Sequence, residues 1–309
     1  MDNYFDTIII GGGPAGLTAG IYLARGKAKV LILDTGTIGG QMVLTHKIAN
    51  YPGVEETSGY QLSSLMKKQA KEFGCQIKSN IKITDINLSD DIKSVVINDK
   101  TTFTSKSMIL ATGGRSRMLK VAGEEDFKGQ GISYCATCDG DFFQDKDIIV
   151  VGGGNSAMEE AVSLTKYASK VTILHEFDHF QAFEHAVEEA KSNSKIDFIM
   201  ESRITEFHGD GKLQKVKYKN LKTNEVFEKD IDGVFIFIGY EANTDMFQNS
   251  SLALNKWNEV IADDFMKTNI DGVFVAGDLR EKKIRQVTTA VSDGTIAAIS
   301  SLDYINNRK

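Results

Sequence analysis

The 309-residue sequence has little cysteine, no excess of basic side chains and no long apolar run. With 36 basic against 42 acidic residues its formal net charge is −6, so it offers nucleic acids and anionic membranes no attractive surface. No stretch approaches the roughly 20 apolar residues that a membrane-spanning helix needs. The first ten residues, MDNYFDTIII, carry two acids where a signal peptide would carry bases. These absences predict a soluble, cytoplasmic protein.

Only three cysteines are present, and two of them form the pair Cys135-x-x-Cys138. A zinc site would need further ligands at a suitable spacing, which neither Cys75 nor the histidines of segment 175–185 supply, so no metal is expected. Because cytoplasmic thiols are kept reduced, a close pair is expected to exchange electrons, with a structural disulfide and zinc as the alternatives. Cys75 stands alone and is expected to be a small buried apolar residue.

One architecture occurs twice along the chain. The stretch TIIIGGGPAG (7–16) runs an apolar strand into a glycine turn, a helix-compatible segment and a second strand, KVLILD. The stretch IIVVGGGNSA (148–157) does the same and is followed by KVTILHE. Polar alternating strands and an apolar strand ending in glycine complete each copy. The chain is therefore predicted to be an α/β protein with two Rossmann-like, three-layer dinucleotide-binding domains.

The first glycine turn predicts a dinucleotide site. Gly11, Gly13 and Gly16 fit G-x-G-x-x-G between strand and helix, which lets the backbone approach a pyrophosphate and offers it the helix N-terminus. Asp34 ends the next strand and is placed to accept a hydrogen bond from a ribose hydroxyl. The second copy, with an alanine in the third position, would be needed to pack strand against helix even without a ligand.

Two dinucleotide folds with a cysteine pair between their glycine turns suggest electron flow through a flavin to a disulfide. Two intervening residues can hold the sulfurs together within one turn, and a thiolate at a helix start is activated for attack. Asp139 follows Cys138 directly and is placed to shuttle the proton that leaving thiolates need. A helix cap is the alternative role for this carboxylate.

The chain resembles the low-molecular-weight thioredoxin reductases over nearly all of its length. The resemblance rests on the segments GGGPAG, GGQM, NYPG, ILATGG, YCATCDG, GGGNSAMEEA, VFVAGD and RQVTTAVSDG. It implies a homodimer that acts on thioredoxin or a thioredoxin-like protein. It also implies a FAD-binding domain made from residues 1–117 and 242–309, with an inserted pyridine-nucleotide-type domain at 118–241 that carries the cysteine pair.

The resemblance also assigns individual residues. In the family the second cysteine faces the flavin and the first attacks thioredoxin, so Cys138 would be the flavin-side thiol and Cys135 the interchange thiol. Asp139 would be the acid-base residue, and Phe142 and Phe143 would lie near the thioredoxin-docking surface. The FAD ligands implied are Gly11, Gly13, Gly16, Asp34, Gln41, Asn50, Asp278, Arg285, Gln286 and Val287.

One departure from the family concerns the electron donor. The family's NADPH signature H-R-R-x-x-x-R is replaced here by HEFDHFQ (175–181), so that Glu176, Phe177 and Gln181 stand where arginines would bind the 2′-phosphate. Each lost charge-assisted contact would remove about 1.5 to 3 kcal/mol, and the carboxylate adds repulsion. NADPH is therefore not the expected donor.

Two other donors stay open. Glu176 lies 19 residues after Ala157, an interval that suits a ligand of an unphosphorylated ribose, and this favours NADH. In the other interpretation the second domain is a scaffold and reduced ferredoxin supplies the electrons, as in similar relatives that lack the signature. The candidate nucleotide residues are Gly152, Gly154, Ala157 and Glu176.

A cluster of basic residues bears on that choice. The segment DLREKKIRQ contains Arg280, Lys282, Lys283 and Arg285, and it is interpreted either as a docking patch for an acidic iron-sulfur protein or as a solvated loop. Two rival functions remain, an NADH-dependent flavin oxidase and a non-enzymatic redox sensor.

Overall fold

The computed structural model describes residues 3–45 and 48–307, except for the side chain of residue 44, and it divides into two compact units. Unit 1 comprises residues 1–115 and 241–309, and unit 2 comprises residues 116–240. The insert expected from the sequence was 118–241. Strands β7 (Gly114–Ser116) and β16 (Tyr240–Ala242), where the chain passes from one unit to the other, form a two-stranded sheet.

Unit 1 is built on a seven-stranded sheet with the order β3-β2-β1-β6-β5-β4, in which β17 also pairs with β6. Its strands are β1 (Tyr4–Ile10), β2 (Val30–Leu33), β3 (Gln76–Lys78), β4 (Ile83–Asn87), β5 (Lys93–Ile97), β6 (Thr101–Leu110) and β17 (Val273–Val275). The ladders joining β1, β2, β3, β6 and β17 are parallel, and β4, β5 and β6 pair antiparallel. Because the parallel strands are covered on both faces, β2 is a continuous apolar run and β1 ends in one, Ile8 to Ile10.

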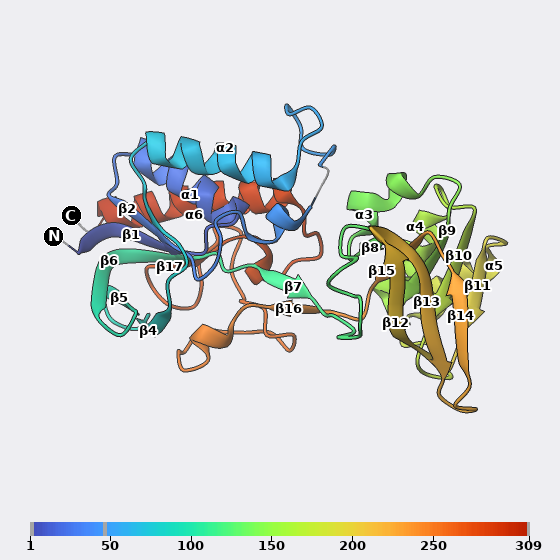
Figure 1. Cartoon of the computed structure of the whole chain (residues 1–309). Coiled ribbons are helices and arrows are strands. Elements are labelled where there is room, and N and C mark those ends of the chain that lie inside the picture. Colours follow the sequence, from blue (N-terminus) through green and yellow to red (C-terminus); the bar gives the residue numbers. More distant parts are fainter. Residues whose placement is uncertain (1–2, 46–47, 308–309) are drawn as a thin grey trace. The chain divides into compact units, whose positions relative to one another are not determined.

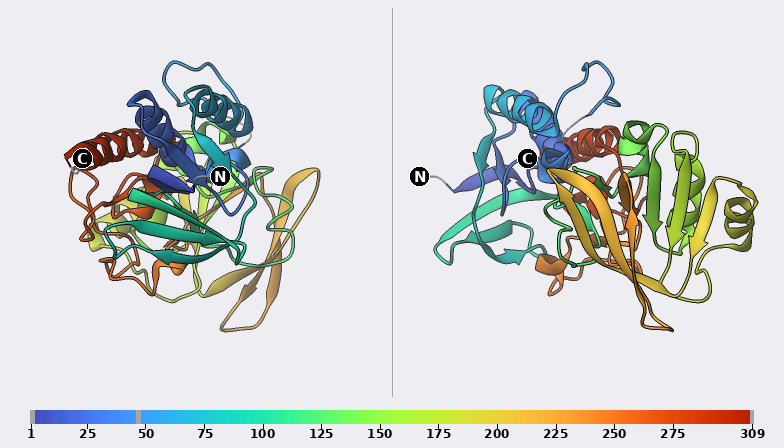
Figure 2. Two further views of the ribbon diagram at one scale, coloured as in Figure 1. Left: turned by 90° about the vertical axis from the view of Figure 1, so that its left-hand side faces the viewer. Right: turned by 45° about the vertical axis from the view of Figure 1, so that its right-hand side comes forward.

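Three helices cover one face of this sheet, namely α1 (Pro14–Arg25), α2 (Gly59–Glu72) and α6 (Val287–Asn307) (Figures 1 and 2). Helices α1 and α6 approach closely because Gly294 has no side chain; a Cβ there would lie 2.3 Å from the carbonyl oxygen of Ala15. The core on the opposite face is formed by side chains of the sheet strands and of residues between 247 and 279. Three 3-10 helices complete the unit, η1 (Gly40–Leu44), η3 (Asp245–Phe247) and η4 (Gly277–Leu279).

Unit 2 has three layers. The central layer is a parallel sheet of order β11-β10-β9-β15-β8, made of β8 (Ile132–Ser133), β9 (Asp147–Val151), β10 (Lys170–Leu174), β11 (Ile196–Ile199) and β15 (Gly233–Ile236). One layer is helical, with α3 (Ala136–Asp139), η2 (Gly140–Phe143), α4 (Asn155–Leu164) and α5 (Glu184–Ser192). The other layer is the antiparallel sheet β12 (Ser202–Asp210), β13 (Lys212–Asn220) and β14 (Val226–Asp230), visible in Figure 1.

Alternate residues of β9 point into the two cores of unit 2. Ile148 and Val150 belong to the core under α4 and α5, whereas Ile149 and Val151 belong to the core under the antiparallel sheet. This architecture confirms the predicted α/β class with two Rossmann-like units, the second inserted into the first. None of the helices within residues 3–45 and 48–307 is both long and apolar enough to cross a membrane.

Candidate functional site

The first glycine turn can be built only with glycine at two positions. Gly11 has φ 108°, and a Cβ there would lie 2.2 Å from the carbonyl oxygen of Ala111. A Cβ at Gly16 would lie 1.9 Å from the carbonyl oxygen of Gly11, so α1 starts in close contact with the turn. At Gly13 the nearest atom to an added Cβ would be 3.9 Å away, on Gly40. The N-terminus of α1 therefore has an open face of bare backbone beside Gly13, as a pyrophosphate requires.

Asp34 lies beside this turn at the end of β2. Its Oδ2 accepts a hydrogen bond from the amide of Gly12 at 2.6 Å, and its Oδ1 accepts one from the amide of Gly36 at 2.7 Å. The carboxylate thus also holds the glycine turn in place, a role that the sequence pattern did not reveal. Each oxygen keeps a further lone pair for a ribose hydroxyl.

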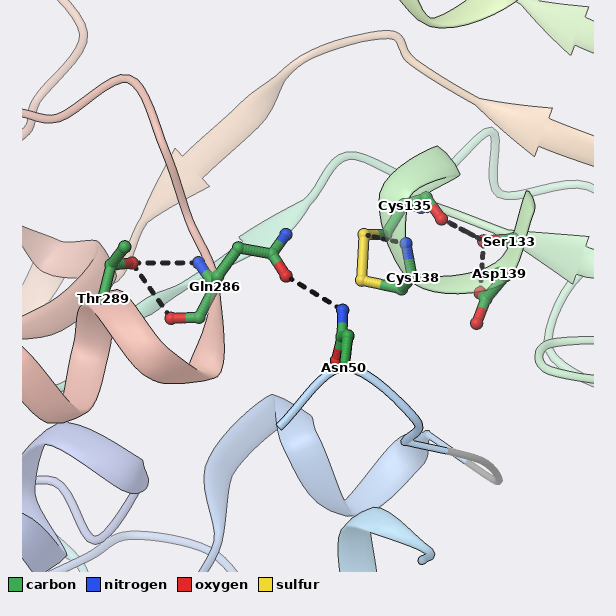
Figure 3. Close-up of a disulfide and its surroundings, with 7 residues drawn as sticks. All are labelled: Asn50, Ser133, Cys135, Cys138, Asp139, Gln286 and Thr289. Carbon is green, nitrogen blue, oxygen red and sulfur yellow. Dashed lines mark hydrogen bonds between the residues drawn. A yellow bond between two sulfur atoms is a disulfide. The ribbon is translucent and has the colours of Figure 1, made fainter. Parts of the chain in front are cut away.

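Two side chains far apart in the sequence meet within unit 1. The amide of Asn50 donates a hydrogen bond to Oε1 of Gln286 at 3.4 Å (Figure 3). Gln286 immediately precedes α6, which begins at Val287, and the backbone N–H of Gln286 donates a hydrogen bond to Oγ1 of Thr289. Gln41 is an exposed residue of η1. The fold therefore brings together Asn50 and Gln286, which the resemblance places near one flavin ring.

Asp278 is a half-buried carboxylate of η4. Burial raises the pKa of its side chain, and the charges of Lys282 and Arg285 partly offset that effect. Arg285 is itself ion-paired with Glu259. With the open glycine turn and Asp34, these groups supply both the backbone donors and the hydroxyl-binding carboxylates that a dinucleotide such as FAD would use.

The basic segment 280–285 differs from both sequence-based interpretations. Arg280 Nε and Lys282 Nζ both donate to Oδ2 of Asp293, at 3.1 and 2.7 Å, and only 7% of the Lys282 side chain is exposed. Arg285 contacts Glu259, which leaves Lys283 as the exposed member of the four. The segment is therefore neither a continuous basic patch nor a solvated loop, because carboxylates from two other parts of unit 1 engage most of its charges.

The cysteine pair forms a disulfide at the start of a short helix in unit 2. Cys135 and Cys138 are bonded, with their Cα atoms 5.3 Å apart, and both are half-buried. Cys135 caps α3, because its Sγ accepts a hydrogen bond from the amide of Cys138 at 3.2 Å (Figure 3). No group of three or more metal-ligating side chains occurs in the part of the chain that the structure describes. Cys75 is buried, as expected, and burial raises the pKa of its thiol to about 11.

Asp139 is the last residue of α3, and its side chain points to a partner that the sequence did not suggest. Ser133 Oγ donates to Oδ2 of Asp139 at 2.5 Å (Figure 3). Asp139 precedes η2 but its side chain caps no amide there, so the helix-cap alternative is wrong. A serine two residues before a cysteine pair was the available signal, since such a hydroxyl often binds nearby backbone.

The two phenylalanines after the cysteine pair have different environments. Phe142 is 39% exposed on η2. Phe143 packs edge-on against Phe235 at a centroid distance of 5.0 Å and covers Gly233, where a Cβ would lie 2.1 Å from its ring. Phe143 therefore anchors η2 to the sheet, and only Phe142 has a surface to offer to a partner.

The second glycine turn repeats the first in its geometry. Gly152 has φ 139°, and a Cβ there would lie 2.4 Å from the carbonyl oxygen of Phe237. Around Gly154 no atom lies within 4 Å of an added Cβ, whereas Ala157 is fully buried against the sheet. Unit 2 thus also has an open backbone face at the start of a helix, α4.

The residue that follows the second strand is different. His175 stands directly after β10, as Asp34 stands after β2, and a Cβ on Gly153 would lie 2.3 Å from its ring. Burial lowers the pKa of His175, and its Nε2 lies 3.2 Å from the carbonyl oxygen of His179, which can only accept. A neutral imidazole therefore occupies the position of the ribose-binding acid, and Glu176 lies one residue further along.

Glu176 has a partner from another layer of unit 2. Its Oε2 lies 3.0 Å from an Nη of Arg203 on β12, and both side chains are substantially exposed. Phe177 is 40% exposed and packs edge-on against the His175 ring. An arginine therefore reaches the end of β10 although the signature arginines are absent, and a search for a local motif could not have found it.

Comparison with known proteins agrees with this geometry. The family model described as pyridine nucleotide-disulphide oxidoreductase matches residues 5–294. The chain is 46% identical to a thioredoxin reductase of Peptoclostridium acidaminophilum, over 99% of this chain and 98% of that protein. It is 43% identical to a 34.2 kDa protein in the rubredoxin operon of Clostridium pasteurianum, over 99% of each chain. The crystal structure of thioredoxin reductase from Streptococcus pyogenes superposes with a TM-score of 0.94 at 40% identity, over 99% of this chain and 100% of that one.

Proposed function

Since the chain belongs to the pyridine nucleotide-disulphide oxidoreductase family, we propose that it passes electrons from FAD through Cys135 and Cys138 to thioredoxin or a thioredoxin-like protein. The chain is an FAD-dependent disulfide oxidoreductase of the thioredoxin reductase type. The observation that carries the proposal is the half-buried disulfide at the start of α3, with the carboxylate of Asp139 in the same turn.

FAD would be held by unit 1. Gly11, Gly13 and Gly16 would present the start of α1 to its pyrophosphate, and Asp34 would accept from the adenosine ribose. Asp278 would bind the ribityl chain. Gln41, Asn50, Arg285, Gln286 and Val287 would line the flavin ring. The support is the open backbone at Gly13, the half-buried carboxylate of Asp278 and the contact between Asn50 and Gln286. When bound, the flavin supplies the electron pair that opens the disulfide.

The cysteines would then act in sequence. Two electrons break the bond between Cys135 and Cys138, and one proton converts the resulting pair of thiolates to a thiol and a thiolate. Cys135 attacks one sulfur of the partner's disulfide, forms a mixed disulfide and expels the other sulfur as a thiolate, which takes up a proton. Cys138 then gives up its proton and attacks Cys135 Sγ of the mixed disulfide, which re-forms the bond between Cys135 and Cys138. The partner's second sulfur leaves as a thiolate and takes up that proton, so the partner is released with two thiols. The amide of Cys138 supports this order, because a hydrogen bond donated to Cys135 Sγ favours its thiolate.

Asp139 would carry the protons between these steps. General acid-base catalysis of this kind contributes about 10²- to 10⁴-fold to a rate. Phe142 would contribute to the docking surface for the partner, since it is the exposed phenylalanine of η2.

The donor that we propose is NADH or reduced ferredoxin, and not NADPH. Glu176 stands where the family places an arginine for the 2′-phosphate, and Arg203, which reaches the same place, is already neutralised by it. NADH is supported by the open backbone at Gly154 and by the carboxylate of Glu176, with Gly152 and Ala157 shaping the turn. Ferredoxin is supported by the ion pair between Glu176 and Arg203, because two side chains that neutralise each other need no nucleotide as a partner. In that case the second glycine turn would serve only as a scaffold for the cysteine pair.

Anaerobic bleaching of the flavin tests the donor. NADPH, NADH and photochemically reduced ferredoxin would be offered separately to the purified flavoprotein, with oxidised thioredoxin present. We expect fast bleaching and several turnovers of thioredoxin with NADH or ferredoxin, and slow bleaching with NADPH. Fast reduction by NADPH would contradict the donor proposal. Oxidation of NADH that continues in a Cys135→Ser, Cys138→Ser double variant would instead favour a flavin oxidase. A single turnover of thioredoxin by the unaltered protein would favour a redox sensor.

We also propose that the chain works as a cytoplasmic homodimer, which its resemblance to the thioredoxin reductases supports. Sedimentation of the FAD-loaded protein should give twice the 34.0 kDa mass of one chain at micromolar concentration. A single-chain mass at that concentration would reject the dimer and leave the proposed reaction unaffected.

A further inference from the structure

Ser133 lies buried at the point where the cysteine segment leaves the sheet of unit 2. It is the last residue of β8 and 4% exposed. Its Oγ lies 2.5 Å from Oδ2 of Asp139 and accepts a hydrogen bond from the amide of Cys135 at 3.1 Å (Figure 3). One hydroxyl therefore joins the backbone of the first cysteine to the carboxylate that follows the second.

The direction of these bonds is determined by the groups involved. The amide of Cys135 can only donate, so the single hydroxyl proton of Ser133 is left for an acceptor. Two acceptors are near, the carboxylate of Asp139 at 2.5 Å and the carbonyl oxygen of Cys135 at 3.3 Å. The shorter contact to the charged group is the stronger one, because hydrogen bonds to ionised acceptors are about twice as strong as neutral ones.

The backbone around Ser133 is held from the other side. Tyr134 donates its hydroxyl proton to Oε1 of Glu124 at 2.8 Å, and Glu124 is 1% exposed and accepts two further bonds from the amides of Leu119 and Lys120. Burial and the charge of Glu124 raise the pKa of Tyr134, so its hydroxyl keeps the proton that it donates. The backbone that carries Ser133 is therefore also fixed from its other side, so that the hydroxyl of Ser133 can fix the orientation of the Asp139 carboxylate.

We propose that Ser133 is a positioning residue that holds Asp139 for proton transfer at the cysteine pair. The inference rests on the proposed acid-base role of Asp139. Ser133 keeps its own proton throughout; the proton that the expelled thiolate takes up passes through the Asp139 carboxyl, whose rotation the Ser133 hydrogen bond limits. The serine consequently acts on the rate of disulfide exchange and not on recognition of the partner.

The test measures disulfide exchange without an electron donor. The FAD-loaded protein is reduced with dithiothreitol, freed of it and mixed with oxidised thioredoxin, and the formation of reduced thioredoxin is followed in a rapid-mixing instrument. For Ser133→Ala we expect the exchange rate to fall about 10-fold with an unchanged KM for thioredoxin, and for Asp139→Asn to fall about 100-fold. Ser133→Thr, which keeps the hydroxyl, should recover most of the rate.

The double variant decides between positioning and a general structural effect. If Ser133 acts through Asp139, adding Ser133→Ala to Asp139→Asn should cost almost nothing further, because coupled residues are not additive. Two effects that multiply would overturn the inference, as would a Ser133→Ala variant with the unaltered rate. Ser202→Ala is the matched control, since Ser202 is a buried serine of unit 2 that bonds only a backbone carbonyl, that of Met200, among its described contacts. Its rate should not change.

The outcomes separate this inference from the proposed function. If the unaltered protein does not exchange with thioredoxin, the proposed function fails and the inference fails with it. If the unaltered protein exchanges normally and the Ser133 variants have the same exchange rate, only the inference fails.

Discussion

At the scale of single residues, the two glycine turns share one backbone geometry but differ in the side chain that lies beside it. Gly11 and Gly152 both have φ values above 100°, and both lie against the carbonyl oxygen of the residue that follows a neighbouring strand. The residue after the next strand then differs. Asp34 binds the first turn through two amides, and a neutral His175 fills the same place in the second. The two turns leave similar room beside the start of a helix, and the side chain that follows the next strand is what distinguishes them.

The two cysteines should give opposite results when replaced singly by serine. In Cys138→Ser, Cys135 can still attack thioredoxin but no thiol remains to resolve the mixed disulfide, so a covalent complex should accumulate. In Cys135→Ser the thiol that attacks thioredoxin is lost and no complex should form. Non-reducing electrophoresis after mixing with oxidised thioredoxin measures both. A complex with Cys135→Ser but none with Cys138→Ser would show that the two roles are exchanged.

At the scale of elements, the segment 277–287 joins η4 to α6 and carries most of the residues expected to touch the flavin. Asp293 holds this segment, because its Oδ2 accepts from the amide of Gly277, from Arg280 and from Lys282. Asp293 is 5% exposed, so these bonds form away from solvent and are weakly screened. The carboxylate of Asp293 on α6 therefore fixes the conformation of much of this segment.

Lys282→Met should therefore weaken FAD binding and the stability of unit 1. Removing the ammonium takes one of three donors from a buried carboxylate, which costs about 1.5 to 3 kcal/mol, and it removes a charge that offsets the raised pKa of Asp278. We expect the FAD dissociation constant to rise about 10- to 100-fold, measured by titrating the apoprotein. Lys283→Met is the control, since Lys283 is exposed on the same segment and should change little. Equal effects of the two substitutions would contradict this role of Asp293.

At the scale of the whole molecule, each unit has its own pair of hydrophobic cores. The cores of unit 1 lie on the two faces of its seven-stranded sheet, and those of unit 2 on the two faces of its parallel sheet. FAD would bind to residues of unit 1 alone. A ligand that binds one folded unit stabilises that unit by mass action, by about 2.7 kcal/mol at a hundredfold excess over its Kd.

Removing FAD should therefore lower the unfolding free energy of unit 1 and leave that of unit 2 unchanged. Hydrogen exchange in increasing urea, measured peptide by peptide, resolves the two transitions. Ile9→Ala in the unit 1 core and Ile173→Ala in the unit 2 core are matched controls that should each destabilise their own unit by about 2 to 5 kcal/mol. A single transition that FAD and both substitutions shift together would show that the chain unfolds as one cooperative body.

The sequence alone determined what depends on local geometry and on composition. The two strand-turn-helix units follow from apolar runs that end in glycines, because only glycine tolerates the close approach at Gly11 and Gly152. The turn between β5 and β6 contains Asn98 and Asp99, two residue types that tolerate the positive φ values they adopt there. The cysteine pair was recognisable because its members are three residues apart and lack further metal ligands.

Only the tertiary structure decided which distant groups share a proton or a charge. Asp293 accepts hydrogen bonds from the basic segment, and Arg203 forms an ion pair with Glu176. Ser133 donates a hydrogen bond to Asp139. Asp293 and Arg203 lie on other elements than the motifs they complete, so no spacing in the sequence indicates their contacts. The position of Ser133 two residues before Cys135 indicates only a bond to nearby backbone, and not the bond to Asp139. The tertiary structure likewise gave two neighbouring phenylalanines different surroundings, because Phe142 is exposed and Phe143 packs against Phe235. The chemistry of a motif can be inferred from its residues, but its charge and proton partners depend on how the sheets and helices pack.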